Sequence, residues 1–288
     1  MEKAVQPGDA MVFQIDDEYD QYLQNKQACR KEDLHKYYCE KILWTKTSAA
    51  VNWFIIQRLL KEYPHFFVLE KNNDHWQLLN KKNDITLRWN FENELLDKSI
   101  YISLFDALCC QIQEDIAICQ INRQDDWLAA IHLCAPNHWS PQDKIGKPFD
   151  AVHAPVADME KVNKHYKKML DSLVHKGPFT RFAWGIATDN RLNHHPIAPQ
   201  HIDEDEWYGR KAENMQSKLY VRTERQNMVG FPGENAFLFT IRTYFYDFDS
   251  LEQHEKIALS EALSSMSAAS LAYKGLTDKI ELVKKRLL

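Results

Sequence analysis

The amino-acid sequence predicts an α+β protein in which an antiparallel sheet is flanked by helices. Two observations lead to this prediction. Several short runs are rich in β-branched and aromatic residues, and between them lie longer stretches with apolar residues at helical spacing. The clearest strand signal is residues 219–246, two alternating runs separated by Gly230, Pro232 and Gly233. Strands in short runs that are interleaved with and flanked by helices are typical of the α+β class.

The individual elements follow from periodicity and from cap and turn residues. Helical spacing predicts one or two helices over 17–44 and further helices over 47–63, 103–120, 158–175 and 250–271, with a short charged helix at the end. We expect Asp158 to cap the fourth of these and Ser250 to open a capping box for the fifth. Strands are predicted over 66–69, 75–79, 86–89, 127–134, 149–153 and 179–186, in addition to the hairpin.

Composition narrows the class of protein. The 288 residues are 44% hydrophobic and 27% charged, which is typical of a soluble globular chain, and we expect one domain over 1–288. Its parts would be a helical N-terminal wrap over about 13–63 and a core over about 64–276. The 36 basic and 41 acidic side chains give a net charge of −5, which does not favour nucleic-acid binding. Gly-rich nucleotide loops are absent from the sequence.

Three further features of the sequence predict that the protein is cytoplasmic. The first twenty residues are acidic and lack the apolar stretch of a signal peptide. No apolar run approaches about 18 residues, so a membrane span is not expected. The six cysteines include no C-x-x-C pair, and reduced thiols in a cytoplasmic protein explain them best.

Three charged side chains interrupt the otherwise apolar hairpin. Arg222 and Glu224 share one face of the first strand, and Arg242 lies on the second. If the strands pair, one face could bring the three together. Such a cluster is either a buried cross-strand ion network or a ligand-binding face, where arginine serves carboxylates and glutamate serves a cationic amine.

Two histidines in apolar surroundings are candidate ligands. His153 ends the segment AVH before Pro155, and His132 lies in the predicted strand AAIHLC. For each, a hydrogen-bonded core histidine is the alternative. A third possibility is a metal site in the polar loop, although the spacing matches no known ligand pattern and a flexible surface loop explains its residues better: His194, His195, His201, Asp203 and Glu204.

Several motifs in this order resemble one known family. They are WLAAIHLCAPNHWSPQDKIGKPFDAVHAPV, TRFAWGI, LYVRTERQ, FLFTIRTY and AYKGL, together with QEDIAI at 113–118. The chain resembles the haem-dependent oxidative N-demethylases, the haem-binding α-subunit of bacterial dimethylamine monooxygenase and its relatives, from about Phe13 to Leu276.

The resemblance implies a PAS-like fold with haem b in an internal pocket. It also implies oxidation of a small methylated amine with O₂, release of formaldehyde, and electrons from a separate flavin and iron–sulfur reductase. A shared fold alone does not identify the substrate.

Residue by residue, the family's His-x-Pro-Val element falls on His153, Pro155 and Val156. The resemblance therefore makes His153 the expected iron ligand, its other ring nitrogen held by a carbonyl or carboxylate. The Arg-x-Glu-Arg-Gln element begins at Arg222 and includes Glu224.

Glu224 is the expected partner of the cationic amine, and Arg222 would hold Glu224 or neutralise a propionate. The resemblance also assigns three residues to the cofactor: Arg225, Arg242 and Trp184.

One departure from the family pattern concerns the pocket. The usual Arg-x-Asn-Trp reads Arg181-Phe182-Ala183-Trp184 here, so an amide is missing at Ala183. Two other functions therefore stay open: a haem or small-ligand sensor with the same fold, and a family member that binds no haem and catalyses nothing.

Overall fold

A six-stranded antiparallel sheet forms the centre of the molecule. The computed structural model describes residues 11–208 and 215–287, so the start of the segment used to exclude a signal peptide lies outside the described residues. The strand order is β1-β6-β5-β9-β8-β7. The strands are β1 (Tyr38–Glu40), β5 (Asp115–Ile121), β6 (Asp126–His132), β7 (Phe179–Ala187), β8 (Tyr220–Phe231) and β9 (Ala236–Asp247). This architecture confirms the α+β class.

The predicted hairpin is confirmed as the longest element of the sheet. Strands β8 and β9 pair without interruption from Tyr220 opposite Asp247 to Phe231 opposite Ala236. The turn is a short 3₁₀ helix, η2 (Pro232–Glu234), followed by Asn235 in the left-handed conformation with φ of 46°. Because the pairing is continuous, the turn fixes which residues of the two strands share a face.

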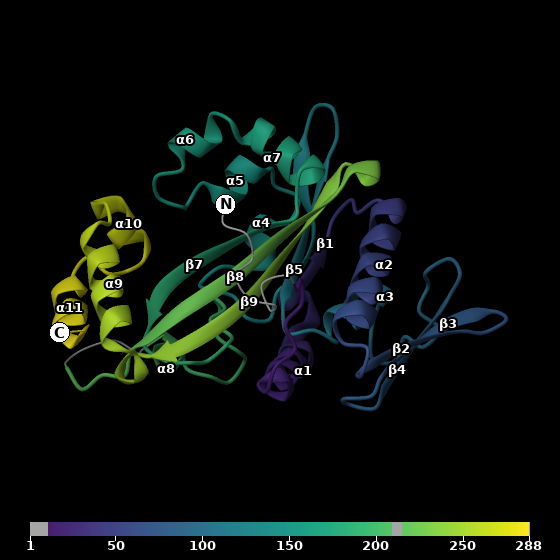
Figure 1. The fold of residues 1–288 in the computed structure, drawn as a ribbon, viewed down its shortest axis with the longest axis horizontal. Helices are drawn as coiled ribbons and strands as arrows, with labels where there is room; N and C mark the ends of the chain where they lie inside the picture. Colours follow the sequence, from purple (N-terminus) through teal and green to yellow (C-terminus); the bar gives the residue numbers. More distant parts are fainter. Residues whose placement is uncertain (1–10, 209–214, 288) are drawn as a thin grey trace.

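A second sheet, a meander of three strands, corresponds to the strands predicted over 66–69, 75–79 and 86–89. It consists of β2 (Phe67–Lys71), β3 (His75–Asn80) and β4 (Ile85–Asn90), paired in that order. Figure 1 shows it at one end of the molecule, away from the hairpin and beside α2.

Helices cover both faces of the large sheet. The helices, with one further 3₁₀ turn, are α1 (Tyr19–Tyr37), α2 (Thr45–Glu62), α3 (Leu104–Cys109), α4 (Pro141–Lys144), α5 (Phe149–His153), α6 (Glu160–Asn163), α7 (Tyr166–His175), α8 (Glu204–Tyr208), η3 (Phe248–Ser250), α9 (Gln253–Ser264), α10 (Ala268–Tyr273) and α11 (Ile280–Leu287). We call the face that carries Arg222 and Glu224 the front face, and the opposite one the back face.

Each face has its own apolar core. On the front, Val152 of α5 packs with Ile131 and Ile241, while Val174 of α7 packs with Met228. Figure 1 shows α5, α6 and α7 together on that side.

On the back, residues of α2 and α3 pack with Ile118 and Leu238. The C-terminal helices α9 and α11 pack around Leu219 at the open end of the hairpin. Together these helices leave the middle of the front face to polar side chains.

Four predicted elements are wrong in type or extent. The helix over 103–120 ends at Cys109, and Asp115–Ile121 is the buried strand β5. A fully buried strand shows no alternation of polar and apolar residues, so its apolar run cannot be told from a helix by periodicity. Conversely, residues 149–153 form helix α5 rather than a strand, directly after Pro148.

The other two errors concern long helices. The helix over 158–175 is interrupted at His165, and Asp158 accepts hydrogen bonds from Ser267 and Ser270 instead of capping it. The helix over 250–271 is two helices, α9 and α10. Its capping box is formed by Glu252 and Glu255 rather than by Ser250. The short helix α4 is capped by Ser140, whose side chain accepts a hydrogen bond from the Asp143 N–H.

Candidate functional site

A row of hydrogen-bonded polar side chains crosses the front face on β7 and β8. Arg222 Nη1 donates to Glu224 Oε1, and Gln226 Nε2 donates to Glu224 Oε2 at 2.9 Å. Arg181 Nε donates to Gln226 Oε1 at 2.6 Å and extends the row onto the edge strand. We call Arg181, Arg222, Glu224 and Gln226 the polar row. Both oxygens of Glu224 thus meet donors, and its charge is directly compensated by Arg222.

Arg222 is the most enclosed member of the row. It is 2% exposed, whereas the Glu224 side chain is 15% exposed. Besides Glu224, its Nη2 donates to the Ala135 carbonyl oxygen at 2.8 Å and to Thr243 Oγ1 at 3.3 Å. A buried guanidinium with these acceptors has one geometry, so it holds the Glu224 carboxylate at a fixed place on the sheet.

The prediction that Arg242 joins Arg222 and Glu224 on one face is wrong. Arg242 lies opposite Arg225 in the register of the hairpin, and Arg222 lies opposite Phe245. Since side chains alternate along a strand, Arg225 and Arg242 are on the back face.

The two back-face arginines bind the N-terminal segment. Arg242 Nη2 donates to Asp16 Oδ2 at 2.8 Å, and Arg225 Nη2 donates to the Met11 carbonyl oxygen at 2.7 Å. The Arg242 guanidinium also lies over the ring of Tyr22, 3.8 Å from its centre. Both side chains are therefore engaged in holding residues 11–22 against the sheet.

His153 ends helix α5 on the front side of the sheet. Its Nδ1 lies 2.8 Å from the Phe149 carbonyl oxygen, which accepts a hydrogen bond, and its ring stacks on Phe149 with centres 4.0 Å apart. Within the described part of the chain, Nε2 makes no hydrogen bond. Burial lowers the pKa of His153, and the charges of Arg181 and Lys144 act in the same direction. The imidazole is thus held neutral with Nε2 as a free electron-pair donor.

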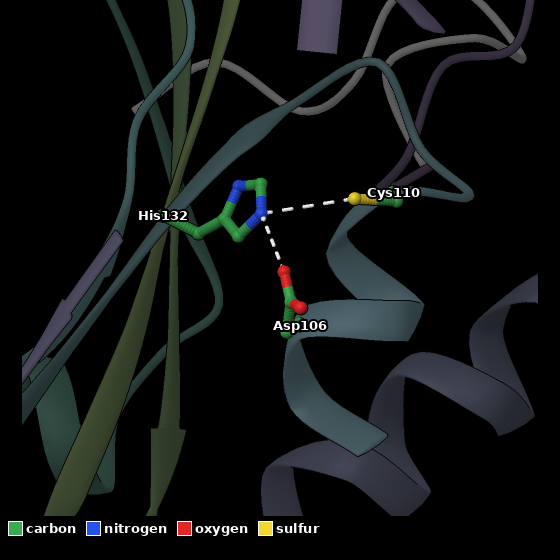
Figure 2. Close-up of side chains that lie close together, drawn as sticks. All are labelled: Asp106, Cys110 and His132. Carbon is green, nitrogen blue, oxygen red and sulfur yellow. Dashed lines mark hydrogen bonds and ion pairs between the residues drawn. The ribbon is translucent and has the colours of Figure 1, made fainter. Parts of the chain in front are cut away.

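His132, the second candidate ligand, has no free ring nitrogen. Its Nε2 lies 3.3 Å from Asp106 Oδ1 and 3.8 Å from Cys110 Sγ, as Figure 2 shows. On the other side, Nδ1 lies 4.0 Å from Cys134 Sγ. Arg30 also donates to Asp106.

The pKa values of the two central side chains of this buried cluster are shifted toward their charged forms. Burial acts to lower the pKa of His132, but Cys134 and the hydrogen bond to Asp106 outweigh it and raise the pKa. Burial acts to raise the pKa of Asp106, yet His132 and Arg30 bring it below its usual value. Two overlapping sets of three ligand-type side chains lie close enough for a metal ion: Asp106, Cys110 and His132, and Asp115, His132 and Cys134. Because Asp106 is already bound by both His132 and Arg30, we interpret the cluster as a core hydrogen-bond and ion network.

The model of the family described as haem-dependent oxidative N-demethylase, alpha subunit-like, matches residues 6–284. The chain belongs to this family. The description of this haem-dependent oxidative N-demethylase-like family implies dependence on haem. Among the described residues, no helix is both long and apolar enough to cross a membrane.

The front face has the donors that a haem requires. A neutral imidazole whose Nδ1–H is fixed by a backbone carbonyl is the usual form of an iron-binding histidine. Arg181 and Arg222 supply the guanidinium groups that pair with carboxylates. Gly185 lies opposite Arg222 on the edge strand, and a Cβ built there would meet nothing within 4 Å. A methyl group added at Gly185 would therefore meet open space.

Residues from two distant parts of the sequence lie near the polar row. Ala183, where the family usually has asparagine, lies opposite Glu224 on the edge strand. Trp184 points to the back face, where Lys274 Nζ donates to its carbonyl oxygen at 2.5 Å and lies 5.3 Å from its ring centre. Burial lowers the pKa of Lys274, and the charge of Glu224 opposes this shift. The late motif AYKGL thus contributes a cation close to the row.

A pair of stacked histidines next to Arg222 was missed by the sequence analysis. The rings of His138 and His194 are parallel within 4° with centres 5.4 Å apart, and His194 Nε2 lies 2.9 Å from Asp189 Oδ1. Burial lowers the pKa of His138 to about 4, with His194 and Arg222 acting in the same direction.

The five-residue metal group proposed for the loop does not form. Within the described residues, no metal-type cluster includes His194, His195, His201, Asp203 or Glu204. The sequence signal for the His138–His194 pair was weak: both residues lie in loops that are rich in histidine. The two loops meet only in the structure, where an isolated β-bridge pairs Asn137 with His194.

Proposed function

We propose that this protein is a haem b-binding monooxygenase that oxidatively demethylates a small methylated amine. The observation that carries the proposal is the neutral His153, with Nδ1 fixed by the Phe149 carbonyl oxygen, on the same side of the sheet as the polar row. The term alpha subunit in the family description favours a partner subunit, and we propose a flavin and iron–sulfur reductase as the source of electrons.

Each front-face residue then has a distinct task. His153 would bind the haem iron through Nε2, and Arg181 is available to a propionate. Glu224 would hold the cationic amine, while Arg222 holds the carboxylate in position. When bound, haem supplies the activation of O₂ and the oxidation of the amine, and the protein supplies binding and orientation.

Three residues expected at the cofactor are proposed as supports. Arg225 and Arg242 fix the N-terminal segment to the back of the strands that carry the polar row. Trp184 anchors Lys274 beside Glu224. We propose that they act on the cofactor only through the position of these strands.

An absorption spectrum of the haem-loaded protein tests the proposal. We expect a Soret band that shifts when a methylated amine is added. His153→Ala should abolish or shift this band. The matched control is His175→Ala, because this side chain is 45% exposed and lies on the outer surface of α7. An unchanged spectrum in His153→Ala would rule out the ligand assignment.

The two other functions predict different results. A sensor binds haem and responds to a ligand, but does not form formaldehyde when a competent reductase and O₂ are supplied. A non-catalytic member gives no Soret band after expression with ample haem. The same preparation therefore separates the three functions.

A further inference from the structure

A small cavity lies at the end of the front face, beyond the polar row. Its volume is about 130 Å³. We call it the aromatic pocket. Its walls come from the start of α1, the start of β8 and the end of β9, and the lining residues used below are Glu18, Gln21, Tyr22, Tyr220, Phe245 and Asp247. A cavity of roughly 150 Å³ in a protein core accepts benzene, so this volume admits an organic molecule of a few heavy atoms.

Three of the lining residues are aromatic: Tyr22, Tyr220 and Phe245. The rings of Tyr220 and Phe245 are perpendicular, at 89°, with centres 6.4 Å apart. Tyr22 is buried, and it packs with Leu192 and Phe245 in one apolar cluster. Perpendicular rings present their electron-rich faces in two directions, which is the arrangement that surrounds alkylated ammonium groups.

The charge of the lining is negative. Glu18 and Asp247 contribute carboxylates, and no lysine or arginine is among the lining residues. Arg242 partly offsets this charge, because its Nη2 lies 3.5 Å from Glu18 Oε2, although its nearer partner is Asp16 at 2.8 Å. One Asp247 oxygen accepts from the Asp249 N–H at 2.9 Å.

A second groove of the protein differs in this respect. It lies between β5, β6 and α7, and it combines Arg123 and Lys167 with Asp125 and Asp171. Mixed charges of this kind select neither sign. The negative, aromatic lining is thus a particular property of the pocket beside Phe245.

We propose that the aromatic pocket binds a small alkylated ammonium ion. The carboxylates attract the charge and accept any N–H, while the rings of Tyr220 and Phe245 contact the alkyl groups. Binding at this place does not depend on haem.

The pocket also has a place in the proposed reaction, and this step rests on the proposed function. The Arg222 guanidinium lies 5.9 Å from the centre of the Phe245 ring, so Phe245 separates the pocket from the polar row. An ammonium ion held by the carboxylates of the pocket would lie one aromatic ring away from the polar row. The pocket then raises the local concentration of substrate next to Glu224.

Titration of the haem-free protein by calorimetry tests the binding step. The probes are dimethylammonium and tetramethylammonium, with neutral tert-butanol as an isostere of similar shape. We expect both cations to bind and tert-butanol not to bind. Asp247→Asn, which keeps the oxygen that caps Asp249, and Tyr220→Leu should each weaken binding by about fivefold.

Two substitutions of opposite charge at the same exposed residue give the sharpest control. Gln21 lines the pocket with an exposed side chain, so Gln21→Lys and Gln21→Glu are expected to leave the fold intact. Lysine should abolish cation binding and glutamate should strengthen it. Asp125→Asn in the second groove should change nothing.

Equal binding of tert-butanol and the cations would overturn the proposal, as would the same affinity in both Gln21 variants. Since haem takes no part, failure here leaves the His153 spectrum as an independent test of the proposed function. Conversely, cation binding without a Soret band would support the pocket alone.

Discussion

At the scale of the residue, the Arg222–Glu224 pair combines a structural and a functional role. Glu224→Ala would leave the Arg222 guanidinium buried without its carboxylate, although two neutral acceptors remain. Losing one partner of a buried pair is strongly destabilising, and we expect a loss of about 3 kcal/mol in the free energy of unfolding. Glu224→Gln keeps an acceptor oxygen and should cost about 1 kcal/mol. Urea unfolding measures both, with Glu261→Ala on the surface of α9 as control.

A small and equal loss in both Glu224 variants would contradict this prediction. It would mean that Arg222 is satisfied by Ala135 and Thr243 alone. In that case the carboxylate is free for a ligand at no structural cost.

The central pair of the polar row was predictable because alternation puts Arg222 and Glu224 on one face whatever the partner strand does. The face of the sheet on which Arg242 lies was not predictable from alternation. It depends on the register, and a shift of one residue moves every side chain of a strand to the other face. The turn ending at Asn235 sets that register, with Arg225 opposite Arg242. The choice between His132 and His153 likewise depended on partners distant in sequence, such as Asp106.

At the scale of the element, the contact between α7 and β8 is as close as two backbones allow. A Cβ on Gly230 would lie 2.0 Å from the Val174 carbonyl oxygen and 2.6 Å from that of Leu173. Gly230→Ala therefore has to push α7 away from the sheet, at a cost of about 3 kcal/mol or more. Gly185→Ala is the matched control, because it is also a strand glycine and nothing lies within 4 Å of its added Cβ. In thermal unfolding, Gly230→Ala should have a clearly lower melting temperature than Gly185→Ala. Equal melting temperatures would show that α7 can move away from the sheet at no cost.

The hairpin and the meander were predictable at this scale, since their apolar residues alternate or are bounded by turn residues. The helices and strands around the candidate site were harder to predict from the sequence. Strand β5 lies between two neighbours and is buried on both faces, so its sequence has no polar side. Helix α5, which carries His153, has only five residues, too few for a helical period to be visible.

At the scale of the whole molecule, the packing of the N-terminal segment on the back face couples folding to pH through Glu114. Its carboxyl group is fully buried, Oε1 accepts from the Gln14 N–H at 2.8 Å, and Oε2 has no partner among the described residues. Burial raises the pKa of Glu114 to about 7 from 4.5, although Arg242 opposes the shift. The folded state therefore holds a proton that the unfolded chain releases at lower pH.

The sign of the pH dependence follows from this difference. Below about pH 4.5 both states are protonated, and the contribution of Glu114 to stability is complete. Between about pH 4.5 and 7 only the unfolded chain loses the proton, so stability falls as the pH rises, by roughly 3 kcal/mol in all, and then levels off. Glu114→Gln keeps the acceptor for Gln14 and cannot ionise.

The difference in unfolding free energy between wild type and Glu114→Gln should therefore move by roughly 3 kcal/mol in favour of the variant from pH 4.5 to 7.5. Urea unfolding at intervals of one pH unit measures it, and the difference cancels the other acidic groups that titrate in the same range. Glu261→Gln, exposed on α9, should show a constant difference across the series. Parallel curves for wild type and Glu114→Gln would mean that water or movement of residues 11–16 solvates the carboxylate, and that the back face opens far more readily than its hydrogen bonds indicate.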